Sequence, residues 1–149
     1  MEKYAEGSVR GPEKIRNMIS INIDRWQNGN PYSSLSIFKN DTGEFIGNIF
    51  ISTYNRSDNT GILGYLIKHE QWSKGYGKEV VLATVKHYTS QLLGIRETDS
   101  ITKIIAYTRL DNIYSQKILD AAGFNIENKT NKFGIDRLKY GLNIIKSPK

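Results

Sequence analysis

The order of strand-like and helix-like runs between Gly61 and Thr108 restricts the fold more than any other part of this sequence. Gly61–Lys68 is strand-like, a glycine-containing turn follows, and Glu79–Leu93 carries apolar residues on one broad helical face. Ile101–Thr108 is strand-like again. A strand, a helix and a second strand form a crossover unit, which is normally right-handed and sets its two strands parallel. We therefore predict that these two strands form a parallel pair.

A helix is predicted ahead of this unit, over Pro12–Trp26. Pro12 suits a first helical turn, and Gly29 follows the expected end. Apolar side chains recur at three- and four-residue steps, which predicts one apolar stripe that packs on a sheet. The stripe comprises Ile15, Ile19, Ile23 and Trp26.

Three consecutive strands are predicted between this helix and the glycine turn. The sequence NDTGE, residues 40–44, is a hairpin signal between Leu35–Lys39 and Phe45–Tyr54. The polar sequence NRSDNT, residues 55–60, marks a second turn before Gly61–Lys68. These three strands should form an antiparallel meander.

A second helix and two final strands complete the predicted fold. The helix lies in DNIYSQKILDAAGF, residues 111–124, with Asp111 or Asn112 as its cap. Phe124–Glu127 and Leu138–Ile145 are the last predicted strands. We therefore expect one α/β (α+β) domain over residues 1–149, with a mixed, mostly antiparallel sheet and flanking helices. The inner face of the second helix is expected to comprise Ile113, Ile118, Leu119 and Ala122.

Composition excludes several classes of site. The chain has no cysteine, which excludes a disulfide framework, a thiolate metal site and a cysteine nucleophile. His69 and His87 lie too far apart for a helical metal pair, so we propose no metal. No apolar run approaches the roughly 20 residues that span a bilayer, and the polar start does not resemble a signal peptide. We expect a cytoplasmic protein that has no membrane partner.

The net charge of +6 suits an anionic ligand, a nucleic acid or an acidic partner equally well. The lysines are scattered, and no nucleic-acid-binding motif accompanies them. A solvated basic surface explains the charge better, so we do not expect a nucleic acid partner.

The turn HEQWSKGYGKEV, residues 69–80, has the composition of an anion site. Glycines allow left-handed backbone angles and close approach to a ligand, and the N–H groups at a helix start carry partial positive charge. Gly75 and Gly77, with Lys74 and Lys78 beside them, are suited to hold a phosphate or pyrophosphate. A plain strand-to-helix connection explains an isolated pair of glycines better, and the turn matches neither a Walker A loop nor a dinucleotide fingerprint.

Two motifs on successive predicted elements favour the anion site over a plain connection. The first is Gly64-Tyr65 with the turn WSKGYG, residues 72–77, and the second is Asn112–Ser115 with the helix end Ala122–Phe124. At this spacing they resemble the Gcn5-related N-acetyltransferase superfamily, most closely its branch of ribosomal-protein N-terminal acetyltransferases (RimJ/RimL type). The resemblance extends from about Pro12 to Ile145. It implies an acetyl-CoA-dependent N-acetyltransferase that acts on a primary amine, either a protein N-terminus or a small molecule.

The resemblance also implies a site. Enzymes of this superfamily bind acetyl-CoA where two parallel strands splay apart, and the pantetheine arm contacts the strand end, here Leu66, Ile67 and Lys68. Asn112 is expected to orient the cofactor or the following loop, although a helix cap alone also explains it. Ser115 is expected to give a proton to the thiolate, although such a serine is often only a local backbone partner. The pyrophosphate is expected on the N–H groups of Trp72, Ser73, Lys74, Gly75, Tyr76, Gly77 and Lys78.

Some positions depart from the family pattern. Leu119 stands where many members have a tyrosine that acts as the acid, which leaves Ser115 with little competition beyond Tyr107 and Tyr114. Ser73 replaces a turn glycine, which is tolerable if its backbone angles are ordinary.

The general base is left open, because Ile62 stands where this branch commonly has a glutamate. Glu44, Glu70 and a chain of water molecules are the candidates. Several aromatic side chains could line an acceptor pocket, although half-buried strand packing explains them equally well. They are Tyr32, Tyr54, Tyr65, Trp72 and Tyr140.

The first strand of the family pattern is expected to be short or missing, because the chain begins almost directly at the second helix of that pattern. An open sheet edge would then allow a homodimer. A catalytically weak module that only binds CoA is the alternative function, and a basic nucleic-acid-binding protein is a third. The acceptor itself cannot be read from the sequence.

Overall fold

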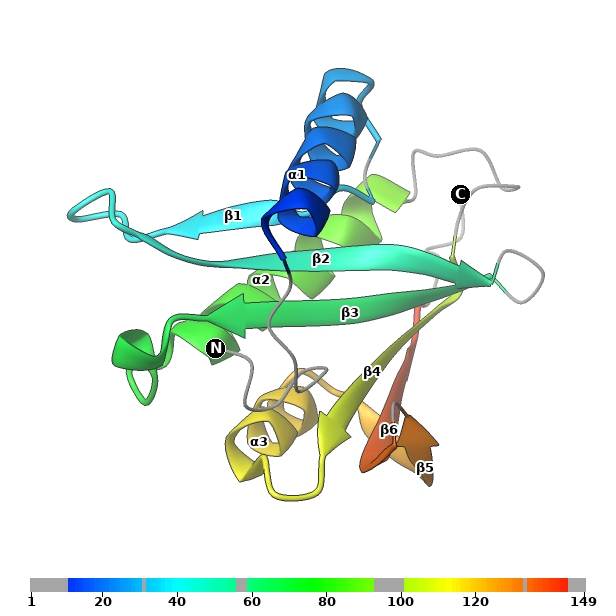
Figure 1. The fold of residues 1–149 in the computed structure, drawn as a ribbon. Coiled ribbons are helices and arrows are strands. Elements are labelled where there is room, and N and C mark those ends of the chain that lie inside the picture. Colours follow the sequence, from blue (N-terminus) through cyan, green and yellow to red (C-terminus); the bar gives the residue numbers. More distant parts are fainter. Residues whose placement is uncertain (1–10, 31, 56–58, 93–100, 133, 145–149) are drawn as a thin grey trace.

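Three α-helices, one short 3-10 helix and six strands make up the part of the chain that the computed structural model describes, residues 11–30, 32–55, 59–92, 101–132 and 134–144 (Figure 1). In chain order they are α1 (Pro12–Gln27), β1 (Leu35–Phe38), β2 (Phe45–Asn55), β3 (Thr60–Ile67), η1 (His69–Gln71), α2 (Tyr76–Leu92), β4 (Lys103–Arg109), α3 (Ile113–Ala121), β5 (Asn125–Lys132) and β6 (Ile135–Asn143).

The six strands form one sheet in the order β1-β2-β3-β4-β6-β5. Every neighbouring pair is antiparallel except β3 and β4, which are parallel. The mixed, mostly antiparallel sheet, the three-strand meander and the single parallel pair are therefore confirmed. The hairpin at residues 40–44 is confirmed too, because the Gly43 amide donates to the Lys39 carbonyl at 2.9 Å and Gly43 has a φ of +70°. The turn at residues 56–58 lies outside the described residues.

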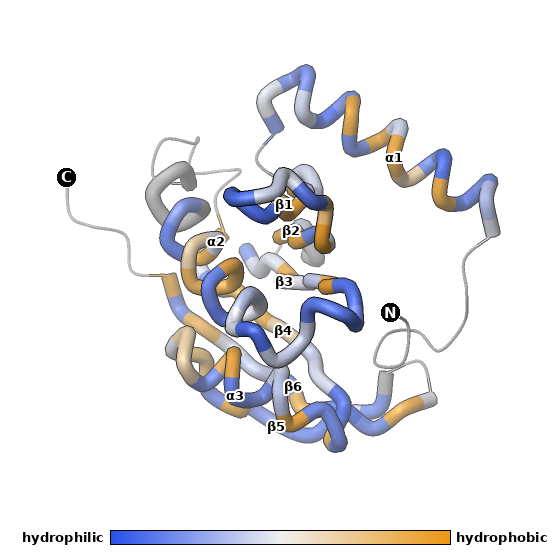
Figure 2. The backbone as a smooth tube through the Cα atoms, turned by 90° about the vertical axis from the view of Figure 1, so that its left-hand side faces the viewer, coloured by the Kyte–Doolittle hydropathy of each residue, from blue (hydrophilic) through white to orange (hydrophobic). Residues whose placement is uncertain are grey.

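The hydrophobic core lies between the sheet and the helices α2 and α3. Figure 2 shows α2 and α1 on opposite sides of strands β1 to β3. Strand β4 contributes three consecutive buried residues, Ile104, Ile105 and Ala106, so it is covered on both faces. The most deeply buried members of the core are Ile46, Ile49, Ile51, Val81, Ile104, Leu119 and Tyr140.

The predicted packing of α1 is wrong, although its bounds agree with the prediction. The expected stripe of Ile15, Ile19, Ile23 and Trp26 is 42% to 53% exposed, and no residue of this helix is buried. The helix is held mainly at its C-terminal end, where Asn22 Oδ1 accepts from the Ser34 amide at 2.8 Å. A pocket, described below, separates the helix from the sheet. Apolar spacing predicts a helix, but it does not show that a partner surface lies within reach.

Three smaller differences have local reasons. Helix α2 begins at Tyr76 rather than Glu79, because the glycine turn itself supplies the first helical residues. The residues expected to form a polar turn after Glu127 instead extend β5 and β6, since β5 is an edge strand that tolerates exposed polar side chains. Ile113 is 53% exposed rather than internal, whereas Ile118 and Leu119 are buried as predicted.

Candidate active site

Strands β3 and β4 splay apart and leave a V-shaped opening in the sheet (Figure 1). They pair only at their beginnings, where Thr60, Gly61 and Ile62 face Lys103, Ile104 and Ile105. Beyond this point β3 continues to Ile67 along β2, and β4 continues to Arg109 along β6. The facing edges of both strands are therefore open to a ligand.

The hydrogen-bond pattern of β3 decides which backbone groups face this opening. The Lys68 amide donates to the Ile46 carbonyl of β2 at 2.8 Å. Backbone groups alternate in direction along an antiparallel pair, so those of Leu66 also face β2, whereas those of Tyr65 and Ile67 face the V. The Ile67 carbonyl accepts from Trp72 Nε1 at 2.8 Å, so the Ile67 amide is a donor directed into the opening.

The glycine turn contains two left-handed residues and ends at the N-terminus of α2. Ser73 has a φ of +60° and Gly75 a φ of +85°, so two left-handed residues stand on either side of Lys74, directly before the helix. The first bond of α2 runs from the Glu79 amide to the Gly75 carbonyl at 3.1 Å. The amides of the preceding first turn, Tyr76 to Lys78, have no partner within the helix and point toward its N-terminal end. Ser73 therefore has a left-handed backbone conformation, not the ordinary one under which serine was expected to replace the family's turn glycine without strain.

The two glycines of the turn have different roles. A Cβ atom on Gly75 would meet nothing within 4 Å, so this glycine supplies only its left-handed conformation. A Cβ atom on Gly77 would lie 2.7 Å from Ile118 Cδ1, so Gly77 allows α2 to approach α3 closely. Positive charge gathers beside the turn, where Lys39 Nζ lies 5.9 Å from the centre of the Tyr76 ring.

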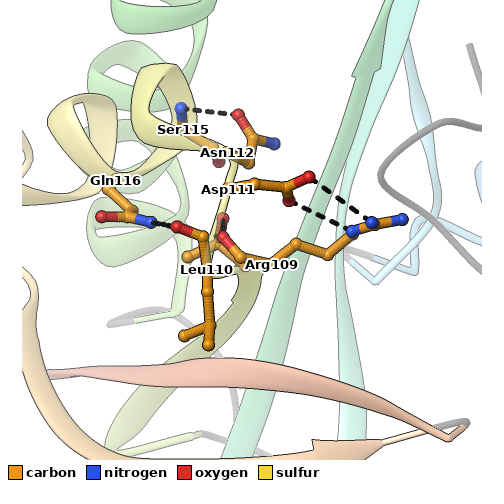
Figure 3. A network of polar contacts seen from close by, with 7 residues as sticks. Arg109, Leu110, Asp111, Asn112, Ser115 and Gln116 are labelled. Atoms are coloured by element: carbon orange, nitrogen blue, oxygen red, sulfur yellow. Dashed lines mark hydrogen bonds and ion pairs between the residues drawn. The ribbon is translucent and has the colours of Figure 1, made fainter.

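The motif asparagine is the N-cap of α3. Asn112 Oδ1 accepts from the Ser115 amide at 3.1 Å, as Figure 3 shows. The preceding loop is held by Arg109, whose Nε lies 3.2 Å from Asp111 Oδ1, and by Gln116, which donates to the Leu110 carbonyl at 3.0 Å. These contacts fix the start of α3 at the open end of the V.

The Ser115 hydroxyl is hydrogen-bonded to the Tyr65 hydroxyl of β3, across the opening. Burial raises the pKa of Tyr65 to about 12, although its hydrogen bond with Ser115 acts in the opposite direction. Tyr65 therefore stays protonated at neutral pH. The sequence drew attention to Tyr107 and Tyr114 near Ser115 but not to this contact, which joins residues 50 positions apart.

Two pockets meet at this hydroxyl pair. The larger, about 540 Å³, lies beneath α1, and the smaller, about 280 Å³, lies beside the glycine turn and includes Trp72 and Ser73 in its wall. The larger volume lies within the range of about 300–1,000 Å³ typical of ligand sites, and the smaller lies just below it. The residues that border both pockets are Tyr65, Leu66, Asn112 and Ser115.

Neither glutamate proposed as a base lies in the wall of either pocket. Glu44 Oε1 instead accepts from Gln71 Nε2 at 3.4 Å, and Glu70 is exposed on η1. Ile62 does line the larger pocket, at the position where the related enzymes commonly carry a glutamate.

The predicted aromatic residues divide between the pockets and the core. Tyr32 and Tyr65 line the larger pocket and Trp72 lines the smaller one. Tyr140 is only 1% exposed and belongs to the core. The side chain of Tyr54 lies outside the described part of the protein.

The described residues contain neither a membrane-spanning helix nor a cluster of metal-ligating side chains. None of the described helices combines the length and the apolar character needed to cross a membrane. Three or more side chains of His, Cys, Asp or Glu do not come together anywhere in this part of the chain in a way that could hold a metal ion.

Solved structures with the same fold include three acetyltransferases. A GNAT-family acetyltransferase from Bacillus anthracis is 21% identical with a TM-score of 0.74, over 95% of this chain and 80% of that one. The ribosomal-protein-S5-alanine acetyltransferase from Vibrio fischeri is 20% identical with a TM-score of 0.74, over 92% and 75% of the two chains. The spermidine N-acetyltransferase from Vibrio cholerae, solved with CoA and spermine, is 14% identical with a TM-score of 0.77, over 97% and 83%.

Sequence comparison gives the family directly. No curated protein sequence matches this chain. The family model described as acetyltransferase (GNAT) domain, however, matches residues 1–125. Since this match covers most of the chain and the sheet has the same fold as solved acetyltransferases, the protein belongs to the GNAT acetyltransferase family.

Proposed function

We propose that this protein transfers the acetyl group of acetyl-CoA to a primary amine, on a protein N-terminus or on a small molecule. The observation that carries the proposal is the meeting of two pockets at the Tyr65 and Ser115 hydroxyls, inside the V between β3 and β4. Acetyl-CoA is the cosubstrate of GNAT acetyltransferases. The pocket beside the glycine turn suits this cosubstrate, and the pocket beneath α1 suits the amine.

The glycine turn is the proposed pyrophosphate site. The amides of Tyr76, Gly77 and Lys78 lie in the first turn of α2, where a helix carries partial positive charge. Lys39 and Lys74 add positive charge beside the turn, the latter 3.3 Å from Gln71 Oε1. The pantetheine arm would then lie along the open edge of β3 and accept from the Ile67 amide.

The reaction needs an amine nucleophile and a stabilised leaving group. The neutral amine attacks the thioester carbonyl carbon, the new N–C bond forms, and the C–S bond breaks. The extra proton of the amine leaves to water, and the CoA thiolate accepts a hydrogen bond and then a proton. Ser115 borders both pockets and lies in the first turn of α3, so its hydroxyl and the helix dipole both favour negative charge on the sulfur.

Tyr65 acts as a positioning residue for Ser115 in this proposal. With a pKa of about 12, Tyr65 is a weak acid that keeps its proton, so it suits the role of a permanent donor to Ser115 Oγ. The Ser115 hydrogen is then directed away from Tyr65, toward the sulfur. Tyr65→Phe should therefore lower kcat, but less than Ser115→Ala does.

The base in this proposal is water, because none of the described residues that line the amine pocket is an aspartate or a glutamate. Ile62 occupies the wall where a carboxylate would be useful. The enzyme should consequently work best at alkaline pH, where more of the acceptor amine is neutral.

Ligand binding and turnover test the proposal together. Acetyl-CoA at about 100 times its Kd should raise the free energy of unfolding by about 2.7 kcal/mol, measured as a shift in Tm. CoA release is then followed across peptide amines, amino acids and polyamines. Absence of a thermal shift would refute the proposal, and binding without CoA release from any amine would leave the CoA-binding module as the function.

Substitution of Ser115 tests the chemistry more narrowly. Loss of one well-placed donor to a developing anion costs about 100-fold in kcat. We expect Ser115→Ala to approach this loss while the Kd for CoA stays within about twofold, and Ser36→Ala on the exposed face of β1 serves as the matched control. Equal kcat values for Ser115→Ala and Ser36→Ala would exclude the role given to Ser115.

The homodimer and the cytoplasmic location stay predictions. Strand β1 is an edge of the sheet among the described strands and pairs only with β2 there, which is the feature that supports self-association. Sedimentation velocity measures the oligomeric state, and cell fractionation measures the location.

A further inference from the structure

The pocket beneath α1 has an unbalanced set of charges. Its wall contains the side chains of Arg25 from α1 and Arg137 from β6. Within the described part of the chain, that wall contains no aspartate or glutamate. Two arginines, contributed by elements far apart in the sequence, therefore line a space that the proposed function assigns to the acceptor, and Arg25 donates from Nη1 to the Tyr32 carbonyl at 3.2 Å.

Arg137 is only 6% exposed, which is rare for a charged side chain. It also interacts with the surrounding protein. A guanidinium carries five N–H donors in a rigid fork, so it can keep such contacts and still offer donors to a ligand. Its burial beside the pocket makes its charge more effective there than it would be at the surface.

The sheet around Arg137 adds to this charge. Arg137 lies directly opposite Arg109 of β4, and Lys139 follows two positions later on the same face. The carboxylates found here are held by cations: Asp111 lies 3.2 Å from Arg109, and Glu127 lies 3.4 Å from Lys139 and in an ion pair with Lys103. A hydrogen bond from Lys103 lowers the pKa of Glu127, which therefore stays ionised and engaged. Basic groups exceed acidic ones on this face.

A positive pocket selects among amines. It repels a polycation, whose charges would have to approach two guanidinium groups, and it attracts an acceptor with a negative charge near its amine. Arginine binds carboxylate and phosphate groups through paired N–H donors, which also fixes the orientation of the ligand. A volume of about 540 Å³ accommodates a small molecule or the first residues of a peptide.

We propose that the acceptor of this enzyme is a primary amine that carries an anionic group close to the amine, and that the positive charge of the pocket arginines, Arg25 and Arg137, favours this group. The proposal rests on the N-acetyltransferase function proposed above and narrows its substrate class. The anion can be a carboxylate or a phosphate, since both match the guanidinium fork.

Matched acceptors test the proposal by pairing each anion with a neutral equivalent. The pairs are alanine with alaninamide, the peptide amide Ser-Glu-Ala with Ser-Gln-Ala, and phosphoethanolamine with ethanolamine, and spermidine is the polycation. CoA release gives kcat/KM for each acceptor. We expect the anionic member of at least one pair to exceed its partner by about tenfold or more, as for loss of a charge-assisted hydrogen bond, and to exceed spermidine. The pair that responds identifies the anion.

Variants on one helix connect this preference to its residues. Arg25→Gln should reduce the anionic-to-neutral ratio severalfold, while Arg16→Gln, which is exposed on α1 outside the pocket wall, should leave the ratio and the Kd for CoA unchanged. Arg137→Gln is a second variant, whose folding is checked by its response to CoA.

The outcomes separate the two proposals. Fastest turnover of spermidine, or equal turnover within every pair, would overturn the anionic acceptor while leaving the N-acetyltransferase intact. An equal ratio for Arg25→Gln and wild type, with Arg137→Gln also unchanged, would overturn the role of the arginines. Failure to release CoA with every acceptor, despite CoA binding, would overturn the proposed function and this inference with it.

Discussion

Replacing Gly75 by alanine should weaken CoA binding much more than it weakens the fold. Gly75 has a φ of +85°, and an added Cβ atom would meet nothing within 4 Å. The cost in the folded state is therefore conformational, about 1–2 kcal/mol. Alanine also restricts the unfolded chain, which offsets about 0.4–1 kcal/mol of this loss. The net destabilisation should be about 1 kcal/mol, or a fall in Tm of about 2–4 °C.

Gly134 provides a matched control for this effect. It lies in the hairpin between β5 and β6, has a φ of +74°, and also leaves nothing within 4 Å of an added Cβ atom. Gly134→Ala should therefore destabilise the protein by a similar amount, measured by urea unfolding, without any effect on CoA.

The binding effect of Gly75→Ala follows from the role of its conformation. A change of φ at Gly75 moves the amides of the turn, and loss of one hydrogen bond to a charged phosphate costs about 1.5–3 kcal/mol. The Kd for CoA, measured by isothermal titration calorimetry, should rise by a factor of about 10 to 150. A Kd for Gly75→Ala within about twofold of wild type would refute the pyrophosphate site. An equally large rise for Gly134→Ala would show that the effect comes from destabilisation.

Three other predictions concern stability and pH. Ser73→Gly should remove the strain of a left-handed serine and raise the free energy of unfolding by about 0.5–1 kcal/mol, measured with urea. Ser36→Gly in β1, the control, should lower it. A lower free energy of unfolding for Ser73→Gly would contradict this reasoning. Gly77→Ala places a Cβ atom 2.7 Å from Ile118 Cδ1 and should lower the free energy of unfolding by about 1–3 kcal/mol. Adding Ile118→Val should restore part of this loss. Additive effects of the two substitutions would argue against the contact. The raised pKa of Tyr65, about 12, makes the stability contribution of its neutral form fully present below pH 10 and lost as pH rises toward 12. The pH profile of kcat should accordingly show no decline near pH 10. If kcat of the wild type fell there and kcat of Tyr65→Phe did not, Tyr65 would lose its proton near pH 10, which would contradict its role as a protonated donor.

Local chemistry made the glycine turn and the start of α3 predictable from the sequence. Glycines before a helix and an asparagine at a helix start have few structural uses, so the turn at Gly75 and the cap at Asn112 are visible in the sequence. The parallel pair was predictable for a similar reason, because a crossover connection requires it. Ser73 shows the limit of this reasoning, since a positive φ at a serine cannot be read from its neighbours.

Tertiary contacts made the pocket beneath α1, which we propose holds the acceptor, unpredictable. The hydrogen bond between Tyr65 and Ser115 depends on how far β3 and β4 diverge, which no local pattern records. Arg137 belongs to a segment whose pattern suggested a polar turn, and only the pairing of β6 with β4 directs it to the pocket. The expectation that the α1 stripe packs on the sheet is wrong because the helix presents Met18 and Arg25 to the pocket, whereas Ile19 and Ile23 are exposed.

The two sides of the site can therefore change independently. Proposed contacts to CoA are mostly backbone groups of one turn and one strand end, so substitutions that preserve the backbone leave them intact. Proposed contacts to the acceptor are side chains from α1 and β6, which take no part in the glycine turn. Replacing Arg25 changes a charge in the acceptor pocket without moving the amides before α2. The same fold occurs in a ribosomal-protein-S5-alanine acetyltransferase and in a spermidine N-acetyltransferase, so the fold alone does not determine the acceptor, and the side chains of the acceptor pocket are where the choice has to be tested.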